Sequence, residues 1–175
     1  SANFRDAQGI LKNSGFNQFN TRLQASTRIL NDKLKIDFNA SYTKRDSEFG
    51  FNEALRYAVL YNPTAPIYGV DSPYQFNADQ YGGYFETLGL FDSFNPVSLQ
   101  NQNTNQGSRN EFTYSTNFKY DVSDNFKLNA IYSQQTSKYT NSAYYRTTSL
   151  FRGNASSPTR KGLASKTSGD NEFKL

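Results

Sequence analysis

The sequence predicts an all-β fold built from antiparallel strands that each have one apolar and one polar face. Two stretches carry this prediction, residues 16–44 and residues 108–139, in which apolar and polar side chains alternate position by position. Such alternation is typical of half-exposed β-strands. The longest unbroken apolar run, residues 57–61, is far too short for a transmembrane helix, which needs about 20 residues.

Residues 16–44 are predicted to form a hairpin closed by a polar turn at residues 30–33 and preceded by a connector over residues 1–15. Apolar side chains recur on both sides of the turn at Leu23, Ala25, Ile29, Ile36 and Phe38. The polar side chains between them include Arg22, Gln24, Arg28 and Asn39. Because the alternation continues across the turn, we expect the first group to share one face of the sheet and the second group the other.

The pattern changes over residues 45–107, which the sequence predicts as one long loop with a short helix near residues 52–61. Asn52 is a candidate N-cap for that helix. An Asn/Gln-rich tract at residues 100–106 is expected to be solvated. The loop is also rich in aromatic residues, among them Tyr74, Phe76, Tyr81, Tyr84 and Phe85. Loops of this length are uncommon in compact domains and are usually functional, so we expect a structured excursion whose rings contact a substrate or a partner.

Residues 108–139 are predicted to form a second hairpin, in which Phe118 and Leu128 belong to the apolar face. Its turn contains Asp124 and has the same chemistry as the first turn, which contains Asp32. Residues 140–170 are rich in Ser, Thr, Asn and Gly and are predicted as a second long loop, after which residues 171–175 start a further strand. Short turns therefore lie at one end of the predicted strands and long loops at the other.

The composition excludes several kinds of chemistry. The chain has no Cys and no His, so it cannot supply the usual ligands of a zinc site or the usual nucleophilic triads. The net charge of +4 is spread among polar residues instead of forming a basic patch for nucleic acid. The acids of the long loop show no spacing that enforces a catalytic pair or a calcium site: Asp71, Asp79, Glu86 and Asp92. We therefore expect no enzyme activity, no cofactor, no metal and no nucleic-acid partner.

Strands with one apolar face, joined by short turns at one end and long loops at the other, are typical of outer-membrane β-barrels. In such barrels the apolar face meets lipid and the polar face lines a water-filled lumen. A soluble β-sandwich, whose apolar faces meet in a core, produces the same alternation and is the alternative. Four to five strands do not close a membrane barrel, which needs about eight. On this interpretation the chain is a partial antiparallel transmembrane β-barrel with long extracellular loops, a piece of a longer protein.

Four segments carry a resemblance to a known family, namely residues 9–16 (GILKNSGF), 20–23 (NTRL), 34–37 (LKID) and 61–69 (YNPTAPIYG). Through them the chain resembles the SusC/RagA family of TonB-linked (TonB-dependent) outer-membrane transporters of Bacteroidetes, essentially over its whole length. The resemblance implies four to five strands of a barrel of about 22 strands. It also implies a location in the cell outer membrane as a multi-pass β-barrel. The plug domain and TonB box of the family have no counterpart in these residues.

The resemblance further implies a function and partners. It implies TonB-dependent import of large nutrients, oligosaccharides or peptides, together with a SusD-like surface lipoprotein. The other implied partners are outer-membrane lipid and the TonB complex, which would act through parts of the protein outside this chain. Arg22, Gln24, Arg28 and Asn39 would then face the lumen. Two other classes stay open, a soluble carbohydrate-binding or adhesin-type β-domain and a secreted enzyme acting through carboxylates.

Overall fold

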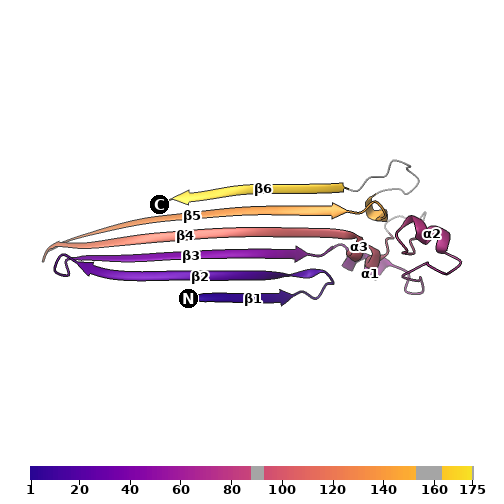
Figure 1. The fold of residues 1–175 in the computed structure, drawn as a ribbon, viewed down its shortest axis with the longest axis horizontal. Helices are drawn as coiled ribbons and strands as arrows, with labels where there is room; N and C mark the ends of the chain where they lie inside the picture. The colour runs from indigo at the N-terminus through magenta and orange to yellow at the C-terminus, as the bar shows by residue number, and fades with distance from the viewer. Residues whose placement is uncertain (88–92, 153–162, 175) are drawn as a thin grey trace.

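The computed structural model describes residues 1–87, 93–152 and 163–174. Within these residues the strands form one six-stranded sheet, in which each strand pairs antiparallel with the next one along the chain. The strands are β1 (Ala2–Gln8), β2 (Ser14–Ile29), β3 (Leu34–Phe49), β4 (Asn103–Ser123), β5 (Phe126–Tyr145) and β6 (Leu163–Lys174). β1 and β6 form the edges, and the helices gather at one end of the sheet (Figure 1). The all-β, antiparallel prediction is confirmed.

Among the described residues, three short helices lie between β3 and β4, and one turn of 3-10 helix follows β5. They are α1 (Ala54–Leu60), α2 (Gln75–Gln80), α3 (Pro96–Gln102) and the 3-10 helix η1 (Leu150–Arg152). In the described part of the chain, no helix is long and apolar enough to cross a membrane. α1 lies within the range in which the sequence predicts a helix, but its N-cap is Glu53 and not Asn52.

The register of the sheet separates apolar from polar side chains. Ala25 pairs with Phe38, whereas the neighbouring Gln24 pairs with Asn39. Because directly paired residues project from the same side of a sheet, such pairs define two faces that continue through β4 and β5. The apolar face includes Leu23, Ala25, Ile29, Ile36, Phe38, Phe118 and Leu128. The polar face includes Arg22, Gln24, Arg28 and Asn39.

The sequence predicts a connector over residues 1–15, but residues 2–8 form strand β1, so the sheet has six strands instead of four to five. β1 pairs with β2 along its whole length, with Phe4 opposite Phe19. Asp6 and Gln8 follow Phe4 on the same side of the strand, so the apolar alternation stops after Phe4. A strand that gains its hydrogen bonds from a neighbour needs no long apolar pattern of its own, and the sequence pattern therefore does not reveal it.

The other boundaries differ from the prediction because the strands extend further than the alternation does. β4 has 21 residues and β5 has 20, beyond the predicted hairpin at residues 108–139. The first connection accordingly covers residues 50–102 instead of 45–107, and the second covers residues 146–162 instead of 140–170. The last strand begins at residue 163, not 171. Toward the long-connection end both faces of the sheet are largely polar, so the periodicity that predicts a strand is weak there.

Residues 50–87 and 93–102, which we call the excursion, pack around a small core beside the end of the sheet. Buried Ala54, Tyr57 and Leu99 form its centre, and Phe51, Phe94 and Phe151 pack against them. The ring of Tyr57 meets the ring of Phe94 edge to face, with centroids 4.9 Å apart. Because Phe151 comes from η1, this core also joins the excursion to the connection between β5 and β6.

The Asn/Gln-rich tract at residues 100–106 is not the solvated loop that the sequence predicts, but the end of α3 and the start of β4. The side-chain amide of Gln100 donates to the carbonyl of Phe51 at 2.8 Å, and its oxygen accepts from the Phe51 N–H at 3.0 Å. The side chain of Gln102 donates to the carbonyl of Tyr81 at 2.9 Å. These side chains are buried because each finds partners on the backbone, which offsets the cost of removing them from water.

Candidate functional site

The polar face has a shallow pocket across the middle of β2, β3 and β4. Arg22, Gln24 and Asn39, three of the residues predicted to face a lumen, line this pocket of about 250 Å³. The pocket is also lined by Ser41, Thr113 and Ser115. Arg28 lies outside it, closer to the short turns and opposite Lys35. Six of its seven lining residues carry an amide, hydroxyl or guanidinium group, so polar groups are available here to water or a polar ligand.

The described residues leave the apolar face uncovered. Leu23 and Leu128 keep 61% and 53% of their surface exposed, and Phe118 keeps 39%. Since the described strands all belong to one sheet, no second sheet covers this face within the described residues. A two-sheet sandwich requires such a cover. A large contiguous apolar surface normally marks contact with a partner or with lipid.

The apolar face ends along a line that crosses the strands obliquely. Toward the excursion, the apolar side chains of each strand from β1 to β5, interrupted only by Thr, end in order at Phe4, Phe19, Tyr42, Phe112 and Tyr132. One further ring of this face, Tyr144, lies beyond this limit on β5, separated from Tyr132 by five polar residues of the same face. Each of these residues can be traced across its strand partners to a position on β2. That position is residue 19 for β1 and β2, residue 21 for β3 and β4, and residue 25 for β5. It shifts by six residues, 25 minus 19, over the four steps from β1 to β5.

This shift corresponds to a definite inclination of the strands. A strand rises by about 3.3 Å per residue and neighbouring strands are about 4.8 Å apart, so the shift along the strands and the distance across them are about equal. The strands are therefore tilted by about 45° from the perpendicular to the line that limits the apolar face. Strands of membrane barrels tilt by about 35–45°. The edge of the apolar face therefore has the geometry that a flat lipid layer imposes on tilted strands.

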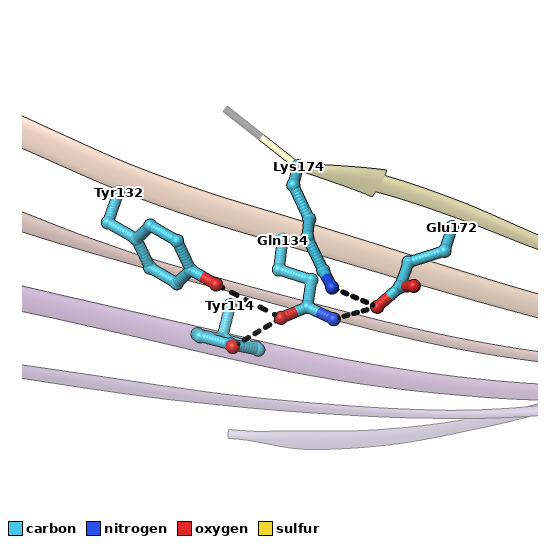
Figure 2. A network of polar contacts seen from close by, with 5 residues as sticks. All are labelled: Tyr114, Tyr132, Gln134, Glu172 and Lys174. Carbon is cyan, nitrogen blue, oxygen red and sulfur yellow. Dashed lines mark hydrogen bonds and ion pairs between the residues drawn. The ribbon is translucent and has the colours of Figure 1, made fainter.

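A polar network lies at this limit on β4, β5 and β6 (Figure 2). The hydroxyl groups of Tyr114 and Tyr132 both donate to Oε1 of Gln134, the latter at 3.3 Å. The amide of Gln134 donates to Glu172, whose carboxylate pairs with Lys174 at 3.1 Å. Tyr132 thus begins on the apolar side and points its hydroxyl toward the polar end, as amphipathic rings do at a membrane–water interface.

Some of the excursion rings predicted to contact a ligand lie at its surface. Phe76 is 81% exposed. Tyr74 is also exposed and packs edge to face against the half-buried Phe85, with ring centroids 4.9 Å apart. These three rings come from α2 and its two flanks, so they present aromatic surface on one part of the excursion.

The other two predicted rings, Tyr84 and Tyr81, differ in how far they are buried. Tyr84 is half-buried and lies against the exposed Tyr68, with centroids 5.2 Å apart and an isolated β-bridge between the two residues. Tyr81 is 1% exposed, so it packs the interior of the excursion and offers no surface to a ligand. Tyr68 is a further surface ring, which the sequence does not predict, and it lies in the segment at residues 61–69 that contains Pro63 and Pro66.

Asn95 holds the excursion together. Its side-chain amide donates to the carbonyls of Ile67 and Phe85 at 2.8 and 2.9 Å. Its side-chain oxygen accepts from the N–H groups of Val97 and Ser98, which caps α3 ahead of Pro96. An Asn followed by Pro is a recognised helix start, so the sequence does contain the signal for this helix.

Tyr61 is a titratable residue of the excursion whose pKa is displaced. Burial raises the pKa of Tyr61 to about 12, from an ordinary value of 10.0, and the nearby Glu86 carboxylate adds to this effect. The phenol donates to the carbonyl of Phe85 at 3.1 Å. Because the folded state favours the neutral phenol, its contribution to stability is complete below pH 10.0 and is lost as the pH rises through about 12.

We expect the Tyr61 phenol to ionise later than an exposed tyrosine. The difference between the ultraviolet titration curves of the wild-type protein and a Tyr61→Phe variant isolates this one phenolate. Its midpoint should lie near pH 12, and a midpoint near 10.0 would show that Tyr61 is solvated in the folded protein.

The loop acids do not assemble into a reactive centre in the described residues. Asp71 and Asp79 are exposed, whereas Glu86 is buried and accepts from the Asn95 N–H at 2.8 Å. Asp92 lies outside the described residues. No group of three or more acidic side chains is close enough to hold a metal ion in the part of the chain that the structure describes.

The described residues thus form an antiparallel sheet with one polar face and one exposed apolar face, and the apolar face ends along an oblique line. The chain is similar to two curated relatives. It is 27% identical over 138 residues to the TonB-dependent receptor SusC of Bacteroides thetaiotaomicron, which covers 73% of this chain and 13% of the relative. It is 32% identical over 133 residues to the TonB-dependent receptor P26 of Formosa agariphila, covering 76% of this chain and 12% of that relative.

These matches confirm the resemblance predicted from the residues: the chain matches one segment of SusC-like TonB-dependent receptors. It spans about an eighth of the length of the curated relatives it matches. No protein-family model and no solved structure matches the chain.

Proposed function

We propose that this chain forms part of the wall of a TonB-dependent importer in the outer membrane. The observation that carries the proposal is the bare apolar face with its oblique edge. The apolar face lies against lipid, and the edge that runs from Phe4 to Tyr132 marks the outer boundary of the membrane. The polar face lines a water-filled lumen and contributes Arg22, Gln24, Arg28 and Asn39 to it. Similarity to two TonB-dependent receptors supports this assignment.

The excursion forms part of the extracellular mouth of this importer. The short turns at residues 30–33 and 123–125 lie at the opposite end of the sheet and face the periplasm (Figure 1). A passive wall needs no folded excursion, and loops carried by a rigid scaffold commonly serve binding. Exposed aromatic rings are frequent anchors of interfaces. The rings that meet substrate or a SusD-like lipoprotein are Tyr68, Tyr74, Phe76, Tyr84 and Phe85.

The cargo of the importer is a large oligosaccharide or peptide, delivered with a SusD-like surface lipoprotein. The TonB complex supplies energy through parts of the protein outside this chain. The chain itself provides a polar path, because amides, hydroxyls and guanidinium groups of the polar face replace the hydration of a polar cargo.

Single-cysteine labelling tests the proposed orientation, since this chain contains no Cys of its own. The full-length receptor, free of other cysteines, would carry either Val59→Cys or Lys33→Cys, both at exposed positions. A maleimide that does not cross membranes should label Val59→Cys on intact cells and should label Lys33→Cys only after the outer membrane is opened. The reverse pattern would place the excursion in the periplasm and overturn the assignment.

A further inference from the structure

The two faces of the sheet carry very different charge. Among the described strand residues, the basic side chains of the polar face are Arg5, Arg22, Arg28, Lys35, Arg45, Arg109, Lys119 and Lys127, and its acidic ones are Asp37, Glu111 and Asp121. The opposite side has as basic residues Lys44, Lys138, Lys166 and Lys174, and as acidic ones Asp6, Asp46, Glu48, Asp170 and Glu172. The polar face therefore has a net charge of +5 and the other side −1, so the positive charge of these strands is concentrated on one surface.

Three of these arginines form a row across the sheet near the excursion. Arg5 pairs with Gln18, Gln18 pairs with Arg45, and Arg45 pairs with Arg109. We call Arg5, Arg45 and Arg109 the arginine row. Like charges directly opposite one another destabilise a sheet, so the pairing of Arg45 with Arg109 is unfavourable, and an anion between them stabilises it.

One aromatic ring supports two of the guanidinium groups. Cζ of Arg5 lies 5.2 Å from the centroid of the Phe16 ring, and Cζ of Arg45 lies 4.0 Å from it. Among the described residues, neither arginine has a carboxylate within 4.0 Å, whereas Arg109 pairs with Glu111 at 2.7 Å. Nε of Arg45 donates weakly to a neighbouring serine hydroxyl at 3.3 Å. Arginines held by an aromatic ring keep a planar fork of N–H groups for a carboxylate.

The aromatic ring of Tyr139, on the neighbouring strand β5, extends the arginine row. Tyr139 pairs with Arg109 on one side and with Gly169 on the other. Its ring lies directly over Gly169, where an added Cβ would come within 2.7 Å of the ring atoms. Only glycine leaves room for this placement. A ring laid against the sheet in this way offers its free face to the C–H face of a sugar.

We propose that the arginine row, with Phe16 and Tyr139, binds acidic oligosaccharides, in which sugar rings carry carboxylate groups. The guanidinium forks take the carboxylates, because charge-assisted bidentate hydrogen bonds are the strong ones. Tyr139 stacks on a sugar ring, and the nearby half-buried Asn20 and Thr43 side chains meet its hydroxyl groups. An acidic peptide satisfies the charges, but the flat face of the Tyr139 ring favours a sugar ring over it. The inference rests on the proposed function and names the substrate class of that importer.

The test uses the full-length receptor in detergent micelles and measures binding by calorimetry. The probes are an oligomer of galacturonic acid and the matching neutral oligomer of galactose. We expect the acidic oligomer to bind at least about tenfold more tightly, since hydrogen bonds between charged groups are stronger than those between neutral groups. The double variant Arg5→Gln and Arg45→Gln should abolish this preference. Lys44→Gln, which removes one exposed charge from the opposite face beside Arg45, should keep it.

Equal affinity for the two oligomers, or the same loss in Lys44→Gln as in the double variant, would overturn the inference. Binding of poly-glutamate that depends on the two arginines, without binding of the acidic oligomer, would also overturn it and assign the row to an acidic polypeptide. Insertion of the receptor into the outer membrane and labelling of Val59→Cys are measured separately. If these fail, the proposed function fails; if they succeed without a preference for acidic sugars, only the present inference fails.

Discussion

Arginine in place of Phe38 is expected to destabilise the membrane-inserted protein by about 2–4 kcal/mol, the cost of a basic side chain on the lipid face near the bilayer midplane. Phe38 is the central residue of the apolar band on β3, between Leu34 at the short turn and Tyr42 at the oblique limit. It pairs with Ala25 on one side and Thr116 on the other, so no neighbouring acid offsets a new charge. Reversible unfolding of the full-length protein from lipid vesicles measures the difference.

Asn39→Arg is the matched control for this variant. Asn39 is adjacent to Phe38 in sequence but belongs to the polar face, where it pairs with Gln24 and lines the shallow pocket with Arg22. An added guanidinium there stays in water, so the change in unfolding free energy should stay within about 0.5 kcal/mol. Equal losses for Phe38→Arg and Asn39→Arg would show that the two faces do not differ in environment.

Alanine in place of Tyr57 is expected to unfold the excursion and leave the sheet intact. Tyr57 is 4% exposed at the centre of the excursion core, and loss of a buried aromatic ring costs about 3–5 kcal/mol. The core is small, with Ala54 and Leu99 as its other buried apolar members, so it has little stability to spare. Limited proteolysis should cut the excursion much faster in the variant. The electrophoretic mobility of the folded, heat-resistant full-length protein should stay unchanged.

Val59→Ala on the same helix is the control, because Val59 is 85% exposed and makes no core contact. Protease resistance and SusD-like lipoprotein association should be normal in Val59→Ala and lost in Tyr57→Ala. If Tyr57→Ala is cleaved rapidly but shows normal uptake and lipoprotein association, the folded excursion is not needed for the function proposed for it.

The sequence predicts the parts of the sheet in which one face is apolar and the other polar. Ala25 and Phe38 fall on one face and Gln24 and Asn39 on the other because side chains alternate along every strand. The extensions of β4 and β5 beyond the apolar limit escape prediction, since a strand with two largely polar faces has no strong periodicity. β1 escapes for a related reason, because its pairing with β2 and not its own pattern creates it.

The candidate site was only partly predictable. The alternation assigns Arg22, Gln24 and Asn39 to one face, but only the register across β2, β3 and β4 brings them around one pocket. The arginine row is harder still to foresee, because Arg5, Arg45 and Arg109 are far apart in sequence and meet through strand pairing. In the excursion, composition identifies the aromatic residues but not their depth, and Tyr81 is buried whereas Phe76 is exposed.

Spin labels at Leu23 and Gln24 give the most direct measurement of the central claim, that the apolar face meets lipid and the polar face meets water. The two residues are neighbours on β2 and project from opposite faces, opposite Ala40 and Asn39. In the full-length receptor in lipid vesicles, a label at position 23 should collide mainly with oxygen, and a label at position 24 mainly with a water-soluble nickel reagent. Water at position 23 and lipid at position 24 would contradict the account.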